Sequence, residues 1–247
     1  MNNRRPRVVF IIPIASPRVV RDWRLACTYL RQTLESIFNS SNENYRVVVA
    51  GNEAPVFDLP QDSRFKFLSL DQTMTVPGDS SWVAAVRDKM TKIAAAWSCA
   101  KSMWNPQYVM KVDWDDLVSS RLVGWLDTAK DEAGYRIKYG WLWRPNSRYT
   151  IQHTEQFDRV CGTCLIIRSD LADREGPFLN TCDGVKFDDA STRIEASDGH
   201  SLIPGAGIGT LLLNDSHIRA DAQFAYLGHP LAIVPFSAAI YRIGHTE

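Results

Sequence analysis

Short apolar runs alternate with longer amphipathic stretches along the first third of the chain. Val8–Ile14 and Tyr45–Ala50 are continuous runs rich in β-branched residues, which is typical of strands buried on both faces of a parallel sheet. Phe65–Leu70 alternates well enough for a third, shorter strand. Between the first two runs, the apolar residues of Val20–Phe38 recur every three or four positions, as on one face of a helix. This order of elements predicts an open α/β sheet, mostly parallel and flanked by helices.

Similar patterns continue toward the end of the chain. A second amphipathic helix is predicted at Trp82–Met103, and it leads into an apolar strand that begins at Tyr108. The later predicted elements are a helix capped by Ser119 or Ser120 and ending near Gly134, strands at Arg136–Trp143 and Gly162–Arg168, a helix at His217–Leu227 stopped by Gly228, and extended segments at Leu231–Pro235 and Ala238–Ile243. Asn180–Gly209 is rich in Gly, Asp and Ser, so we expect a long flexible loop there. Because no repeat or clear linker is visible, we predict a single domain over residues 1–247.

Composition narrows the classes of partner and the compartment. The chain has 247 residues, enough for a substantial core, and its 28 acidic residues balance its 28 basic ones. This balance argues against a nucleic acid or an anionic membrane surface as the main partner. No apolar run has the length of a transmembrane segment, and the run behind the basic N-terminus is short and broken by Pro13, which makes a poor signal peptide. Five scattered cysteines do not suggest a disulfide framework, so we predict a cytoplasmic protein.

Three carboxylates follow the strand that begins at Tyr108. The segment YVMKVDWDDLVS places Asp113, Asp115 and Asp116 at the end of an apolar run, and carboxylates packed this closely repel one another unless a cation neutralises them. Oxygen ligands suit a hard ion such as Mg²⁺ or Mn²⁺, which completes its shell with substrate phosphates. The alternative is an acidic turn from strand to helix, with Asp116 or Ser119 capping the helix.

Four motifs, taken in order, resemble the glycosyltransferases of the GT-A fold, especially the large inverting family that includes cellulose- and chitin-synthase-like enzymes. VVFIIPIAS is similar to that family's opening nucleotide-binding strand, and YRVVVAGNE to its second strand and base-contacting loop. VDWDD is similar to its Asp-X-Asp-Asp metal motif. GTCLIIRSDLADREGPF resembles a later strand, basic residue and short helix near the acceptor. Together the motifs cover most of residues 7–179.

The resemblance implies a nucleotide-diphosphate sugar donor, a carbohydrate or other hydroxyl acceptor, and inverting transfer. Residues 7–118 would form the half that binds the nucleotide sugar, and residues 119–247 the half that binds the acceptor, with the flexible loop on the acceptor side. Mn²⁺ or Mg²⁺ would be held by Asp113 and Asp115. The implied donor-binding positions are Pro13, Ala15, Ser16, Asn52, Glu53 and Asp113.

Two functions from other classes stay open. One is nucleotidyl transfer onto a sugar phosphate, although the segment PIASPRVV after the first strand lacks the glycines that such enzymes carry. The other is a non-catalytic module that binds a sugar or nucleotide.

The resemblance places the catalytic base near the start of the late helix, where the family carries an acidic pair. In this chain that pair falls on Ser216 and His217, and Asp215 lies just outside it, so Asp215 is the candidate base that deprotonates an acceptor hydroxyl. The alternative is that Asp215 or Ser216 caps the helix. Other carboxylates available in the preceding loop are Asp183, Asp188, Asp189 and Asp198.

Further candidates have structural alternatives. Lys89 and Lys92 are placed to approach the diphosphate, but Asp88 and Lys92 also have the spacing of an ordinary surface ion pair on a helix. The resemblance suggests His245 as a further metal ligand, although a histidine this close to the end of the sequence is more often solvated.

Cysteine and aromatic side chains have structural explanations as well. Cys161 and Cys164 have no second cysteine pair nearby, so we interpret them as core residues. Trp141, Trp143 and Tyr149 either stack on a sugar ring or pack against the core.

Overall fold

The structure is a computed structural model that describes residues 5–71, 82–153, 155–174, 181–182, 185–186, 194–195, 201–202, 217 and 220–244. Its helices are α1 (Trp23–Phe38), α3 (Trp82–Trp104), α4 (Leu122–Thr128), α5 (Phe157–Val160), α6 (Ser169–Ala172) and α7 (Ala220–Tyr226). Its strands are β1 (Val8–Pro13), β2 (Tyr45–Gly51), β3 (Phe65–Ser69), β4 (Tyr108–Lys111), β5 (Leu117–Val118), β6 (Gly134–Arg136), β7 (Gly140–Trp143), β8 (Thr150–His153), β9 (Leu165–Arg168), β10 (Thr181–Cys182), β11 (Val185–Lys186), β12 (Ile194–Glu195), β13 (Ser201–Leu202), β14 (Ala232–Ile233) and β15 (Ala239–Arg242).

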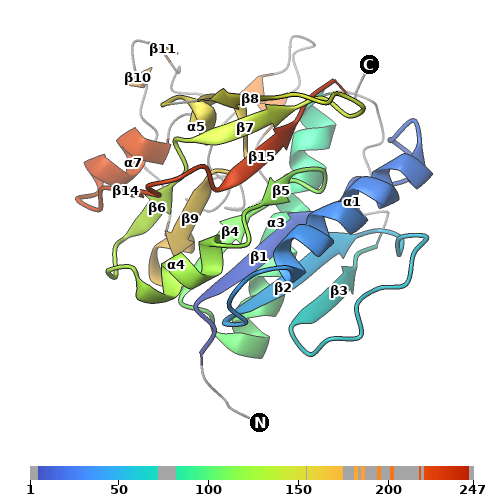
Figure 1. Cartoon of the computed structure of the whole chain (residues 1–247), viewed down its shortest axis with the longest axis horizontal. Helices are drawn as coiled ribbons and strands as arrows, with labels where there is room; N and C mark the ends of the chain where they lie inside the picture. Colours follow the sequence, from blue (N-terminus) through green and yellow to red (C-terminus); the bar gives the residue numbers. More distant parts are fainter. Residues whose placement is uncertain are drawn as a thin grey trace.

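The central sheet has seven strands in the order β14-β6-β9-β4-β1-β2-β3. Strands β3, β2, β1 and β4 are parallel, and β6 and β14 are parallel to each other. The chain leaves β1 in one direction along the sheet and returns from β3 to β4 in the other, so right-handed crossovers place α1 and α3 on opposite faces. Figure 1 shows α1 in front of the sheet and α3 behind it. The predicted open, mostly parallel α/β sheet is confirmed.

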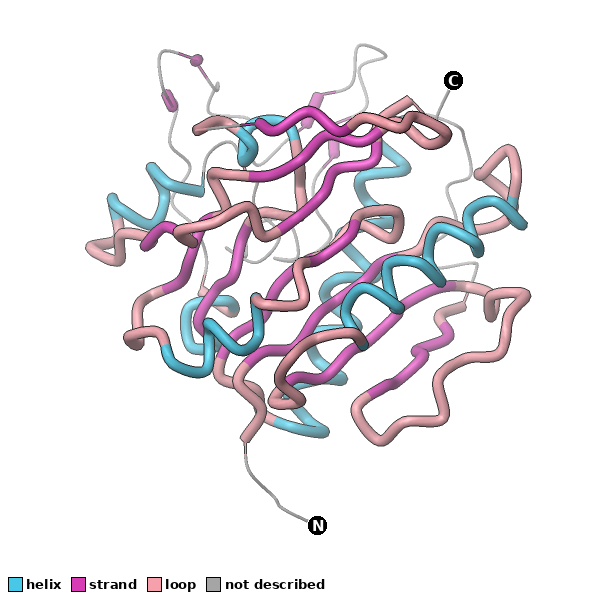
Figure 2. The backbone as a smooth tube through the Cα atoms, in the orientation of Figure 1, coloured by secondary structure: helices cyan, strands magenta, loops and turns pink. Residues whose placement is uncertain are grey.

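Strand β9 runs against its neighbours, since it pairs antiparallel with both β4 and β6. A second sheet has four strands in the order β5-β15-β7-β8, in which β15 is parallel to β7 and antiparallel to β5. In the orientation shared by Figure 1 and Figure 2, β7, β8 and β15 of this sheet lie in the upper part of the view, above the long parallel strands. Strands from distant parts of the sequence therefore meet in it, because β5 and β15 lie more than 100 residues apart.

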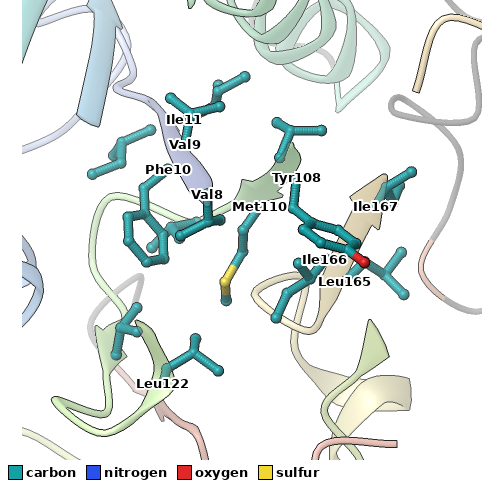
Figure 3. Close-up of a cluster of buried hydrophobic side chains, with 14 of the residues drawn as sticks. Val8, Val9, Phe10, Ile11, Tyr108, Met110, Leu122, Leu165, Ile166 and Ile167 are labelled. Carbon is teal, nitrogen blue, oxygen red and sulfur yellow. The ribbon is translucent and has the colours of Figure 1, made fainter. Parts of the chain in front are cut away.

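The core is built on the middle of the central sheet. Every residue of β1 is buried, as are the first three residues of β4, which fits the continuous apolar runs in the sequence. Figure 3 shows side chains from four elements converging there, among them Phe10, Met110, Leu122 and Ile166. The parallel strands are thus held by apolar packing on both faces.

The structure differs from the sequence predictions in the middle of the chain. The helix expected to end near Gly134 is shorter, since α4 ends at Thr128 and Gly134 begins β6. A Cβ at Gly134 would lie 2.4 Å from the carbonyl oxygen of Ile166, so this position is a close approach between paired strands and not a helix end. The single strand expected at Arg136–Trp143 is two strands, β6 and β7, which belong to different sheets.

Toward the end of the chain the agreement is closer. Helix α7 is followed by Gly228 at φ 75°, a left-handed conformation that favours glycine, as predicted. Between residues 180 and 209 the structure describes only the pairs β10–β11 and β12–β13, so the predicted flexible loop otherwise lies outside the described residues. None of the described helices combines the length and the apolar character that crossing a membrane requires.

Candidate functional site

A cleft of about 370 Å³ opens where the central parallel strands end. Its walls are the end of β1 at Pro13–Ala15, one face of α3, the acidic loop Asp113–Asp115, and the segment Tyr241–Gly244 at the end of β15. This edge, beyond the carboxyl ends of the strands, is where open α/β sheets bind ligands. Six of the predicted site residues line this cleft together: Pro13, Ala15, Lys89, Lys92, Asp113 and Asp115.

Asp113 is held at the cleft by two contacts. Its backbone N–H donates to Thr163 Oγ1 at 2.9 Å, and its Oδ1 lies 2.5 Å from Lys89 Nζ. Burial acts to raise the pKa of Asp113, but the ammonium of Lys89, together with the positive charges of Lys111 and His217, holds the pKa below its ordinary value. Asp113 is therefore ionised and already paired with a cation.

Asp116 is completely buried and does not belong to the cleft lining. Its Oδ2 accepts hydrogen bonds from Thr163 Oγ1 at 2.5 Å and Cys161 Sγ at 3.3 Å, and its Oδ1 accepts one from the backbone N–H of Arg242 at 3.3 Å. Burial, followed by the negative charges of Asp113 and Asp115, raises the pKa of Asp116 to about 8. Asp116 links the acidic loop to the loop before β9 and to the small sheet.

Lys92 and Asp88 form a buried ion pair. Lys92 Nζ lies 2.6 Å from Asp88 Oδ2, and the two side chains are only 1% and 7% exposed. The prediction of an ordinary surface ion pair is therefore wrong, because the face of α3 that carries this pair is covered. Burial lowers the pKa of Lys92 although the Asp88 carboxylate acts to raise it. A buried ion pair contributes little net stability. Its position on the cleft wall is therefore consistent with a role in the site.

The carboxylates of the acidic loop fit a hard divalent cation. No group of three His, Cys, Asp or Glu side chains suited to a metal exists among the described residues. Asp113 and Asp115 both face the cleft, and Mg²⁺ commonly takes one or two protein carboxylates and completes its shell with substrate phosphates and water. A Cβ at Gly162 would lie 3.0 Å from Asp113 Oδ2, so the glycine leaves space beside this oxygen.

Three predicted donor-binding residues lie away from the cleft. Ser16 is buried, and its Oγ accepts from the backbone N–H of Arg18 at 3.3 Å. Asn52 is buried after β2 and donates to the Leu70 carbonyl at 3.4 Å, whereas Glu53 is exposed. None of the three belongs to the cleft lining, and their roles in donor binding stay predictions.

Several other predicted residues lie outside the described part of the chain. They are the candidate base Asp215, the candidate metal ligand His245, and the alternative carboxylates Asp183, Asp188, Asp189 and Asp198. Their roles stay predictions.

Burial decides the interpretation of the cysteines, whereas stacking of Trp141, Trp143 or Tyr149 on a sugar ring stays a prediction. Cys161 and Cys164 are completely buried in the loop before β9, which confirms that they are core residues. Trp143 packs against the Arg242 guanidinium, whose Cζ lies 5.2 Å from the ring centroid. Arg242 lies three residues before His245 and did not stand out in the sequence, because nothing in a short extended segment marks one arginine as buried.

Comparison with known proteins gives distant structural likenesses. No family model matches the chain, and no curated protein matches it. The chain is similar to TarS of S. aureus (residues 1–349) in complex with UDP-GlcNAc, at TM-score 0.47 and 12% identity over 98% of this chain and 60% of that one. It has the same TM-score and identity with the UDP complex, over 96% of this chain and 61% of that one. The chain thus spans about three-fifths of those chains, and its fold class rests on its own strand order.

Proposed function

We propose that this protein transfers a sugar from a nucleotide-diphosphate donor to an acceptor hydroxyl, with inversion at the sugar carbon. The observation that carries the proposal is the meeting of Asp113, Asp115 and Lys89 with the end of β1 around one cleft. A ligand there would face both carboxylates and cations, which suits a diphosphate bound together with a divalent metal ion. The order of the four sequence motifs supports the same function.

The cleft residues divide into two roles. Asp113 and Asp115 would hold Mn²⁺ or Mg²⁺, which when bound neutralises charge on the leaving diphosphate. Lys89 would turn from Asp113 to the phosphates, and its side chain, 47% exposed, is accessible to a ligand in the cleft. Lys92 stays paired with Asp88, and both residues form part of the cleft wall. Asp215 would accept the proton of the acceptor hydroxyl.

A thermal-shift screen tests donor binding. Nucleoside diphosphates and their sugars, including UDP and UDP-GlcNAc, are added with Mn²⁺ or with EDTA, because a bound ligand raises the midpoint of unfolding. We expect one nucleotide series to stabilise the protein only when metal is present. If no nucleotide shifts the midpoint under either condition, the proposed function is wrong.

Asp115→Asn tests the metal site. We expect this variant to fold but to lose the metal-dependent shift, while Asp170→Asn keeps it. Asp170 is a suitable control because it lies in α6, pairs with Arg168 and is 53% exposed away from the cleft. Equal shifts of the unfolding midpoint in both variants would show that metal-dependent nucleotide binding does not need the Asp115 carboxylate.

Asp215→Asn tests the chemistry separately from binding. We expect donor binding to persist and transfer to an acceptor to fall by about 100-fold or more, since a general base contributes factors of this size. Unchanged turnover would assign the base to another carboxylate.

Release of pyrophosphate from a nucleoside triphosphate and a sugar phosphate would instead indicate nucleotidyl transfer. NMR of the product's anomeric configuration tests inversion.

A further inference from the structure

Three cationic side chains line the cleft within the described residues, and two of them are paired with carboxylates. Lys89 Nζ lies 2.5 Å from Asp113, and Lys92 Nζ lies 2.6 Å from Asp88. Arg242, the third, differs. Its Nε, Nη1 and Nη2 atoms are buried and have no hydrogen-bond partner in the described part of the structure. Of these three side chains, Arg242 is thus the one whose N–H donors find no acceptor among the described residues.

Arg242 is held by contacts that leave its N–H groups unused. Its guanidinium carbon lies 3.9 Å from the ring centroid of Tyr29 on α1 and 5.2 Å from that of Trp143 on β7. The backbone N–H of Arg242 donates to Asp116 Oδ1, and Arg242 is the partner of Trp143 in the pairing of β15 with β7. Aromatic rings attract a guanidinium through its charge, whereas its five N–H donors lie in its plane and need acceptors.

Leaving these donors unsatisfied in the interior is costly. A buried polar group without a hydrogen bond loses its hydration and gains nothing in return, and such groups are rare in folded proteins. The two aromatic contacts offset part of the cost but supply no acceptor. A phosphate entering the cleft would supply several, since the planar guanidinium matches phosphate oxygens in pairs.

We propose that Arg242 binds the diphosphate of the donor, in the cleft that it lines together with Lys89 and Lys92 of α3. This inference rests on the proposed function for the identity of the ligand. The phosphate oxygens accept from the guanidinium, while Tyr29 and Trp143 hold its plane in position. The donor diphosphate is then contacted by the small sheet as well as by the acidic loop. Arg242 is a binding residue. Loss of its hydrogen bonds lowers the affinity for the diphosphate and leaves the contacts with the nucleoside intact.

Calorimetric titration of Arg242→Gln tests the proposal. The probes are the nucleoside diphosphate selected by the thermal-shift screen, its parent nucleoside, and inorganic pyrophosphate, each with Mn²⁺. We expect affinity for the nucleoside diphosphate and for pyrophosphate to fall by about 10- to 100-fold, because hydrogen bonds to a charged group are lost. Affinity for the nucleoside is expected to stay within about 2-fold, a difference too small to represent a lost hydrogen bond.

Two further variants separate binding from folding. Arg242→Lys keeps the charge without the paired donors, so we expect it to fold and to lose about 3- to 10-fold in diphosphate affinity. Arg64→Gln is the matched control, because Arg64 also packs against aromatic rings, at 4.9 Å from Tyr45 and 5.4 Å from Phe38, and lies away from the cleft lining. It is expected to lower the unfolding midpoint and leave all three affinities unchanged.

The outcomes are distinguishable. If the unmodified protein binds the nucleoside diphosphate and both Arg242 variants bind it equally well, Arg242 is a structural residue and the inference is wrong while the proposed function stands. Equal losses for nucleoside and diphosphate would also overturn the inference, because they indicate a collapsed cleft. If the unmodified protein binds neither a nucleoside diphosphate nor pyrophosphate, both proposals fail.

Discussion

The central strands carry two unlike regions along their length. Their middle parts are apolar on both faces, as Figure 3 shows for β1, β4 and β9. Beyond the carboxyl end of β4, the chain places three buried or half-buried carboxyl groups, Asp113, Asp115 and Asp116. Lys92 of α3 lines the same cleft as Asp113 and Asp115. The first region depends on volume and fit, whereas the second depends on which charge faces which. The same sheet therefore supplies stability in one place and costs stability in the other.

Phe10→Ala is expected to have the largest effect on the apolar region. Phe10 is completely buried in β1 and packs edge-on against Tyr45, with ring centroids 6.0 Å apart. Truncation should lower the free energy of unfolding by about 3–5 kcal/mol, since it removes buried area and leaves a cavity. Urea denaturation measures this change. A loss below about 1 kcal/mol would mean that the middle of the sheet repacks easily, in contrast to the close packing described here.

Lys92→Ala tests the charged region, and its expected effect on stability is similar to that of Phe10→Ala. It removes the ammonium from the buried Asp88 carboxylate, so we expect a loss of about 3–5 kcal/mol in the free energy of unfolding. The control is Lys101→Ala on the same helix, because the Lys101–Asp173 pair is also short, at 2.5 Å, but its side chains are 44% and 43% exposed. That control should change stability by less than about 1 kcal/mol. Similar losses in both variants would contradict the burial of the Lys92 pair.

Asp116→Asn tests the pH dependence of the charged region. The pKa of Asp116 in the folded protein is raised to about 8 by burial and by the neighbouring carboxylates. Its stabilising contribution is therefore complete below the pKa of an unfolded aspartate and is lost as the pH rises from about 4 to about 8. In EDTA, urea midpoints of the unmodified protein should fall across this range relative to those of the variant. Parallel pH profiles would show that Asp116 has the same pKa in both states.

Lys89→Ala is expected to have the smallest effect on stability. The Lys89–Asp113 pair is partly exposed, so its loss should change the free energy of unfolding by less than about 1 kcal/mol. Donor affinity should fall nonetheless, because Lys89 is placed to turn toward the phosphates. Combined urea denaturation and calorimetry separate the two effects. A large loss of stability with unchanged donor affinity would mean that Lys89, like Lys92, stabilises the fold and does not bind the donor.

Local patterns in the sequence were sufficient for the parallel part of the fold. The runs at Val8 and Tyr45 and the three-to-four spacing of Trp82–Met103 depend on neighbouring residues alone, and β1, β2 and α3 follow them closely. The acidic loop was also identifiable, since three aspartates after an apolar run are visible without any tertiary information. The structure brings two of these aspartates, Asp113 and Asp115, to one cleft.

What the sequence did not show depends on contacts between distant segments. Arg136–Trp143 is an apolar and aromatic stretch that locally resembles one strand, and only its pairing with β9 and with β15 divides it between two sheets. Asp88 and Lys92 have the spacing of any surface pair, and their burial comes from what packs over α3. Arg242 draws its environment from Tyr29, Trp143 and the acidic loop, which are all remote from it in sequence.

The reversed direction of β9 determines what can reach the cleft. A parallel strand in this position would end at the ligand edge, whereas β9 begins there, so the residues just before it arrive at the ends of the other strands. That segment contains Gly162 beside Asp113 and Thr163 bonded to both Asp113 and Asp116. The preceding β8 and α5 are connected to the acidic loop through this short segment, which lies between the end of α5 at Val160 and the start of β9 at Leu165. Changes in β8 or α5 can therefore alter the placement of the carboxylates while the apolar sheet beneath stays the same.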